Sequence, residues 1–401
     1  MSNDLPGRAI FFIFIFCMLL SFYPARLSCQ ESILSSYERN FIRASLAEKP
    51  WVLRDAALDE KSGDFIGALS ETALQFALAN SRSLRNDPDM ITLVAAAARG
   101  AGTGGNKASS KTLWELFRVF QDSYSRVEIL GALAALGKGD AEVIGNLNRF
   151  LEESNNSFRR EGVQDFPVVR ACVAALGVLG DSSSFPILFS AMTASYPQTV
   201  AQEILKALES IEGDFKDYLI SVIRRNPLHE KAAAFRLGAY NEKLKAAERG
   251  ELALAALEVS LNPSVAGSGP MAASLRYDAI TVLTRLQWSP ASHLAVRNFY
   301  QVQRDYMSGA ASRDRFLEAI TCLGVMETSE AAQALALLLG YFNSLTEQLG
   351  EYDEAVILAL INALGELGDK AAFDYLLYIG YLNYPDKIQA SAREALNRLK
   401  W

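Results

Sequence analysis

The two histidines of the chain are the first residues to consider for metal binding or acid–base chemistry. His229 is followed by Glu230, which is how the zinc motif His-Glu-x-x-His begins, but Ala233 stands where the second histidine would be. His293 has no potential ligand at helical spacing. A zinc site needs at least three nitrogen, sulfur or oxygen ligands, and these cannot be assembled around either histidine. The sequence therefore predicts no metal site.

A glycine-rich segment, Gly100–Lys107, superficially resembles a phosphate-binding loop. In such a loop Gly-Lys-Ser/Thr opens a helix after a strand, so that backbone N–H groups and the lysine surround the phosphates. Here Asn106 separates glycine from lysine, and the preceding Met90–Arg99 has a helical pattern. The segment is therefore expected to be a flexible loop between helices, without a nucleotide.

Candidate nucleophiles also lack partners. The sequence contains no Gly-x-Ser-x-Gly elbow, and neither Cys172 nor Cys322 has a plausible histidine and acid. Both cysteines lie in apolar helical segments, which favours buried free thiols that act as small hydrophobic residues. A disulfide between them is the alternative in an oxidising compartment. No catalytic residue and no cofactor is predicted.

The composition describes a folded acidic protein. Half of the residues are apolar, and 39 basic against 46 acidic side chains give a net charge of −7 without long runs of one sign. An even, mildly acidic surface does not attract phosphate, so no nucleic-acid partner is expected.

The N-terminus carries an apolar run, Ala9–Phe22, preceded by one arginine. A helix of this length spans about 21 Å, less than the hydrocarbon core of a membrane. Residues 1–29 are therefore interpreted as a signal peptide, and the chain as exported to the periplasm or cell envelope. Cys29 is a candidate lipidation site, although Leu27 is one position too close for a lipobox. Plain cleavage near Cys29 and an uncleaved anchor are the alternatives, and membrane attachment is expected only through this segment.

The rest of the chain has helical periodicity and a repeated phrase. It occurs at Ala135-Leu136-Gly137, Ala175-Leu176-Gly177, Cys322-Leu323-Gly324 and Ala363-Leu364-Gly365. Several copies continue into a Gly-Asp turn that would end one helix and cap the next. Val169 to Asp181 is the best copy, and it resembles the HEAT repeat of bacterial proteins. The resemblance implies an all-α fold, a right-handed superhelix of about eight or nine antiparallel helix pairs between residues 64 and 400.

A longer internal repeat overlies this pattern. Residues 165–212 align with 353–400 at a constant offset of 188, with fifteen identities in 48 positions. This indicates duplication of a block of several repeats. It predicts a lead-in at 30–63 and two lobes, 64–262 and 271–401, joined near 262–270.

The repeat makes further predictions about single positions. Asp165 and Asp353 should cap helices. Where Arg170 is matched by Leu358, the leucine should be covered by a neighbouring helix and the arginine should reach solvent or an acid.

Two other motifs have mainly structural interpretations. Tyr196-Pro197 and Tyr384-Pro385 should each stop one helix and start the next, with the tyrosine packed. Asn155-Asn156-Ser157 fits a glycosylation acceptor, but the bacterial style of the repeats suggests an accidental match.

The expected function follows from the fold class. Stacked helix pairs form an extended surface, which predicts a scaffold that binds a protein or peptide partner. The alternative is an enzyme, because some short bacterial HEAT proteins resemble the lyases that attach bilin pigments to phycobiliproteins.

Overall fold

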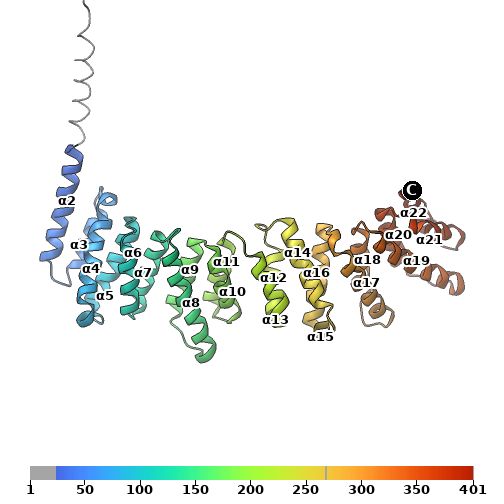
Figure 1. The fold of residues 1–401 in the computed structure, drawn as a ribbon, viewed down its shortest axis with the longest axis horizontal. Helices are drawn as coiled ribbons and strands as arrows, with labels where there is room; N and C mark the ends of the chain where they lie inside the picture. Colours follow the sequence, from blue (N-terminus) through green and yellow to red (C-terminus); the bar gives the residue numbers. More distant parts are fainter. Residues whose placement is uncertain (1–23, 267–268, 401) are drawn as a thin grey trace, which may run out of the picture. The chain divides into compact units, whose positions relative to one another are not determined.

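The computed structural model describes residues 24–266 and 269–400, and the described residues form helices without a named strand (Figure 1). The contacts divide the chain into two compact units, one ending at Gly213 and the other beginning at Asp214. The apolar run Ala9–Phe22 lies outside the described residues. None of the helices in the described ranges is both long enough and apolar enough to cross a membrane.

The first unit consists of five helix pairs within its described residues. The helices are α2 (Pro24–Arg43), α3 (Lys49–Leu58), α4 (Ile66–Leu84), α5 (Pro88–Thr103), α6 (Ser109–Val119), α7 (Ser123–Leu136), α8 (Ala141–Glu161), α9 (Phe166–Leu179), α10 (Phe185–Thr193) and α11 (Gln198–Ser210), with short 3₁₀ helices η1 (Ser62–Asp64) and η2 (Ser182–Ser184). Within each pair the helices pack together, and α3, α5, α7, α9 and α11 also pack side by side. We call these the second-helix layer of the unit and the others its first-helix layer.

The second unit repeats this plan over its described residues. Its helices are α12 (Lys216–Arg225), α13 (Leu228–Ala239), α14 (Ala246–Ser260), α15 (Pro263–Ala266), α16 (Pro270–Leu286), α17 (Ser292–Met307), α18 (Arg313–Gly324), α19 (Ser329–Leu349), α20 (Glu354–Leu367), α21 (Phe373–Tyr378) and α22 (Asp386–Asn397), with η3 (Ser289–Ala291), η4 (Lys370–Ala372) and η5 (Ile379–Tyr381). Here the second-helix layer consists of α13, α16, α18, α20 and α22. Counted from α4, the described helices make nine pairs, within the eight or nine expected from the sequence.

The division between the units differs from the lobes expected from the sequence. That expectation placed the junction at 262–270, where Gly-Ser-Gly-Pro interrupts the helical pattern. However, α14 and α16 on either side of this segment pack against each other as one pair. The break in the sequence therefore ends a helix without ending a unit. The expected lead-in 30–63 forms α2, α3 and η1, which pack on α4 and α5.

Small residues set the spacing within the second-helix layer. A Cβ atom added to Gly177 in α9 would lie 3.0 Å from Ala207 in α11, and one added to Gly365 in α20 would lie 3.0 Å from Ala395 in α22. Gly180 and Gly368 end α9 and α20 in the left-handed conformation, with φ of 68° and 64°. The repeated Ala-Leu-Gly phrase thus allows close helix contact, and the Gly-Asp turn ends the helix.

Aspartates begin the helices, as predicted. Asp165 accepts a hydrogen bond from the backbone N–H of Val168 at 3.3 Å, and Asp353 accepts one from Ala355 at 3.0 Å. Such N-caps each contribute about 1 kcal/mol.

The two copies of the internal repeat have the same elements at the same offset. The bounds of α8 and α9 become those of α19 and α20 when 188 is added, and η2 becomes η4. The match at an offset of 188 therefore extends upstream to residues 141 and 329. We call residues 141–212 copy 1 and residues 329–400 copy 2. The backbone N–H of Glu212 donates to Gly180 in copy 1, and that of Lys400 donates to Gly368 in copy 2.

Candidate binding surfaces

A hollow of about 790 Å³ lies in the second-helix layer of the first unit, over α3, α5 and the start of α7. Small side chains line it, among them Ala57, Ala96 and Gly100. Trp51 also lines the hollow, with 64% of its surface exposed, and so does Tyr124, with 49% exposed. Its volume lies in the range of ligand-binding sites in proteins.

The position of α3, and with it Trp51, is fixed by a buried lysine. Lys49 in the first turn of α3 donates a hydrogen bond to the carbonyl oxygen of Phe41 in α2. Its ammonium group also lies 4.3 Å from the ring centre of Phe41 and 4.9 Å from that of Phe76. Burial lowers the pKa of Lys49. The cation is therefore held by a carbonyl and two aromatic rings, and these contacts fix α3 against α2 and α4.

Two arginines bring positive charge to this hollow. Arg99 forms an ion pair with Glu128 at 3.4 Å and donates to the hydroxyl of Tyr124 at 2.9 Å. Arg54 stacks near Trp51, with 5.5 Å from its guanidinium carbon to the ring centre. It makes no ion pair with any residue that the structure describes. Asp89 is the one acidic side chain among the described residues of the lining, so Arg54 is available to a carboxylate of a ligand.

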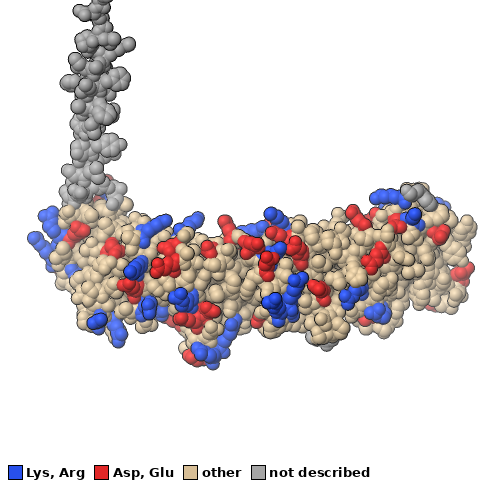
Figure 2. Space-filling view, in the orientation of Figure 1, with Lys and Arg blue, Asp and Glu red and all other residues tan. Residues whose placement is uncertain are grey.

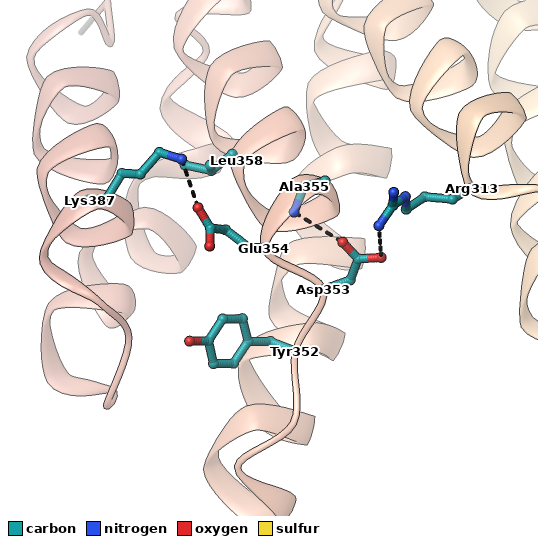
Figure 3. Close-up of a pocket in the computed structure, with 7 residues that line it drawn as sticks. All are labelled: Arg313, Tyr352, Asp353, Glu354, Ala355, Leu358 and Lys387. Atoms are coloured by element: carbon teal, nitrogen blue, oxygen red, sulfur yellow. Dashed lines mark hydrogen bonds and ion pairs between the residues drawn. The ribbon is translucent and has the colours of Figure 1, made fainter.

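A second hollow, of about 570 Å³, lies in the second-helix layer of the second unit (Figure 3). The N-terminal ends of α18, α20 and α22 surround it. Its charges are already paired, because Lys387 contacts Glu354 at 2.7 Å and Arg313 contacts Asp353 at 3.7 Å. The internal ion pairs make this hollow the weaker candidate for a charged ligand.

Leu358 lines this second hollow, and the expectation that a neighbouring helix covers it holds only in part. Its side chain is half-buried and faces the hollow, as does Lys387 of α22, which reaches to Glu354. Its counterpart Arg170 is exposed, as predicted.

The residues singled out from the sequence for chemistry lie apart. His229 and His293 are exposed, and His293 pairs with Glu330 at 3.3 Å. No group of three potential metal ligands occurs among the described residues. Cys29 falls within α2, and its lipidation stays a prediction.

The glycine-rich segment is only in part the loop between helices that the sequence predicts, because residues 104–108 connect α5 to α6 whereas residues 100–103 are helical. α5 continues to Thr103, because Gly100 fits against Ser70 of α4. A Cβ atom on Gly104 would lie 2.4 Å from the backbone nitrogen of Gly67. The glycines therefore allow close packing of α5 on α4.

Both predicted thiols are buried and free. Cys172 is fully buried and Cys322 is 1% exposed. Burial raises the pKa of Cys172, and it raises that of Cys322 to about 11. At neutral pH both groups are protonated and inaccessible, which suits packing and not catalysis.

The two tyrosines before proline are packed, as predicted, but they differ in bonding. In copy 2 the hydroxyl of Tyr384 bonds to Thr346 at 2.9 Å and donates to the side-chain oxygen of Asn343 at 3.3 Å. In copy 1 Phe158 occupies the place of Thr346 and stacks on Tyr196, with 4.3 Å between ring centres. The hydroxyl of Tyr196 has no partner among the described residues, and burial raises its pKa to about 12.

Asn155, the asparagine of the apparent glycosylation motif, is 1% exposed. Its amide donates to the carbonyl oxygen of Ile187 at 3.2 Å. A sugar could not be attached to this amide in the folded protein, so the motif is accidental.

The sequence does not predict the hollow beside Trp51. Trp51 falls in the expected lead-in, and only the packing of α3 on α5 brings it near Tyr124. Elsewhere the surface is mixed in charge, and Figure 2 shows acidic and basic side chains interspersed on the face it displays.

Comparison with known proteins adds little. No family model matches the chain, and no curated protein matches it. A crystal structure of an engineered protein from a structural genomics consortium is similar over 88% of this chain and 99% of its own, at 16% identity and a TM-score of 0.36. A similarity this weak supports no inference about function.

Proposed function

We propose that the chain is a binding scaffold of the HEAT-repeat type that holds a protein or peptide partner on its second-helix layer. The hollow beside Trp51 is the observation that carries this proposal. Trp, Tyr and Arg are the residues that most often dominate binding energy at protein interfaces, and here Trp51, Tyr124 and Arg54 line one hollow. The long helices beneath them are packed through alanine and glycine, so the site needs little ordering before it binds.

The chemistry of the hollow favours one kind of ligand. Its small side chains leave room for aliphatic or aromatic groups, while Arg54 offers a guanidinium group to a carboxylate. An extended peptide segment with an acidic residue next to an apolar one fits both features. A binding role is preferred to a bilin lyase or another enzyme, because the exposed groups that stand out in this lining, Trp51, Arg54 and Tyr124, are those that dominate binding at protein interfaces.

The cellular location is part of the proposal. The apolar run before Pro24 supports export to the periplasm or cell envelope, with attachment through a lipid on Cys29 or through the segment itself. A phosphatase reporter that is active only after export, fused after Gln30, should be active in cells. An inactive but intact fusion would contradict export.

Site-specific photo-crosslinking tests the binding proposal. Thr92 lines the hollow and is exposed, so a photoreactive residue placed there should crosslink to one discrete partner in cells. Asn156, exposed on α8 in the first-helix layer, is the matched control position. The adduct at position 92 should disappear when Trp51→Ala and Arg54→Glu are introduced. Equal adducts at both positions, or an adduct that survives these substitutions, would contradict the proposal.

A further inference from the structure

A second surface, in the first-helix layer of the second unit, is unusually apolar. Its exposed side chains are Leu337 and Tyr341 on α19, Leu377 and Tyr378 on α21, and Tyr381 on η5, which we call the tyrosine face. Their exposed fractions are 52%, 49%, 41%, 39% and 77%. Large apolar side chains exposed together mark interaction sites more often than chance exposure does.

Contacts between α19 and α21 make this a continuous surface. A Cβ atom on Gly340 would lie 2.7 Å from the ring of Tyr375, so the glycine lets this ring lie directly on α19, between Leu337 and Tyr341 in sequence. The hydroxyl of Tyr378 donates to the carboxylate of Glu347, further along α19, at 2.9 Å. This hydrogen bond raises the pKa of Tyr378.

The internal repeat shows that the fold does not require four of these five apolar side chains. Copy 1 has matching helices at the same offset, with α10 in the place of α21 and η5, but its counterparts of Leu337, Tyr341, Tyr378 and Tyr381 are Arg149, Glu153, Ser190 and Thr193. The fifth residue, Leu377, is matched by the buried Phe189. Even the contact of Tyr378 with Glu347 has a polar equivalent, because Arg159 donates to the carbonyl oxygen of Ser190 at 2.7 Å. One framework thus carries a charged surface in copy 1 and an aromatic one in copy 2.

The charges around the tyrosine face define its partner. α19 and α21 hold three acidic side chains, Glu347, Asp374 and Glu330, of which Glu330 pairs with His293, and no lysine or arginine. The preceding η4 adds one lysine, Lys370, so the surroundings stay acidic. A second copy of this chain placed face to face would bring like charges together, and an anionic membrane would be repelled. A basic partner gains both apolar burial and charge pairing.

We infer that the tyrosine face docks a partner protein through a segment that presents aliphatic side chains flanked by lysine or arginine. The tyrosine rings supply apolar area, and their hydroxyls with Glu347 and Asp374 pair with the flanking cations. This surface is separate from the hollow beside Trp51, so the two can be tested independently.

The test uses the full chain and a synthetic amphipathic peptide with a leucine face and lysine flanks, with binding followed by fluorescence anisotropy. Copy 1 supplies the matched variant, Leu337→Arg, Tyr341→Glu, Tyr378→Ser and Tyr381→Thr, whose side chains the same framework already accommodates. This variant should bind at least tenfold more weakly, and the same peptide with glutamate in place of lysine should also bind at least tenfold more weakly. Val178→Arg, at an exposed valine of α9, should leave the affinity unchanged.

Hydrogen exchange places the bound peptide and separates the outcomes. Protection of α19 and α21 on binding supports the inference. Equal affinity of the wild-type chain and the four-substitution variant overturns it. Dimerisation that the variant abolishes would assign the face to a second copy, and variant-sensitive binding to anionic vesicles would assign it to a membrane, so either result also overturns it.

Discussion

The side-chain amide of Asn343 in α19 donates a hydrogen bond to the backbone carbonyl oxygen of Tyr375 in α21, at 3.0 Å. The same bond joins Asn155 to Ile187 at 3.2 Å, at positions 188 residues earlier in both cases. All four positions belong to the internal repeat. A buried asparagine with the same backbone partner in both copies indicates that they share a packing arrangement, beyond the general pattern of helical repeats.

The first prediction concerns this asparagine. Asn343→Leu leaves the carbonyl oxygen of Tyr375 and the hydroxyl of Tyr384 without this buried partner, at a cost of about 1–3 kcal/mol in the free energy of unfolding. Urea unfolding followed by circular dichroism measures it. The control is Ser344→Ala at the exposed neighbouring position, which should change stability by less than about 0.5 kcal/mol. Equal stability of both variants would contradict the assigned role.

Removal of the hydroxyl group should have different effects on stability at the two packed tyrosines. Tyr384→Phe removes two hydrogen bonds and should cost about 1 kcal/mol. Tyr196→Phe removes a buried hydroxyl without a partner among the described residues, and it should be neutral or stabilising. Thermal unfolding of the two variants distinguishes them, and a larger loss for Tyr196→Phe would show that its hydroxyl is bonded.

Two glycines, Gly104 just after the end of α5 and Gly131 inside α7, should respond oppositely to alanine. At Gly104 the new methyl group would collide with Gly67, and the overpacking should cost about 1–3 kcal/mol. At Gly131, inside α7, nothing lies within 4 Å, so alanine should stabilise the helix by about 1 kcal/mol. Chemical denaturation of both variants tests the close approach of α4 and α5. Stabilisation by Gly104→Ala would refute it.

The buried thiols predict a dependence on pH. Burial raises the pKa of Cys322 to about 11, whereas an unfolded thiol titrates near about 8.5. Between these two pKa values the folded state binds more protons than the unfolded state. The free energy of unfolding should therefore fall as the pH rises from about 8.5 to about 11. Cys322→Ala should make the free energy of unfolding less dependent on pH in this range.

The burial of the thiols also predicts their reactivity. At pH 7 a thiol reagent should label Cys172 and Cys322 only after unfolding, and rapid labelling of the native protein would show that they are accessible.

The sequence predicts much of the local structure because small residues and caps leave direct signals. Gly180 and Asp165 mark a helix end and a helix start wherever they stand, and the constant offset of 188 transfers both to copy 2. α8 and α19 carry weaker signals, because their shared positions, such as Asn155 and Asn343, are spread along otherwise different helices. Their equivalence becomes visible only through the common bounds and the common hydrogen bond.

The hollow beside Trp51 could not be predicted from the sequence, for a physical reason. Trp51 and Tyr124 belong to helices far apart in the chain, and the hollow between them depends on the small side chains of α5. The tyrosine face is similar, because Leu337 and Tyr341 would be assigned to a buried helix face from their apolar character. The exposure of an apolar side chain depends on which other helices pack against its own helix, and the local periodicity of the sequence does not specify those neighbours.

The proposed function places a partner on the second-helix layer, at the hollow beside Trp51. Its most direct test is calorimetric titration of the partner identified by crosslinking at Thr92 into the full chain and into the Trp51→Ala, Arg54→Glu variant. Both side chains lie at the surface, so the variant should keep the wild-type melting temperature. The Kd of the variant should be at least tenfold higher than that of the wild-type chain, which corresponds to about 1.4 kcal/mol of binding free energy. An unchanged Kd with an unchanged melting temperature would contradict it.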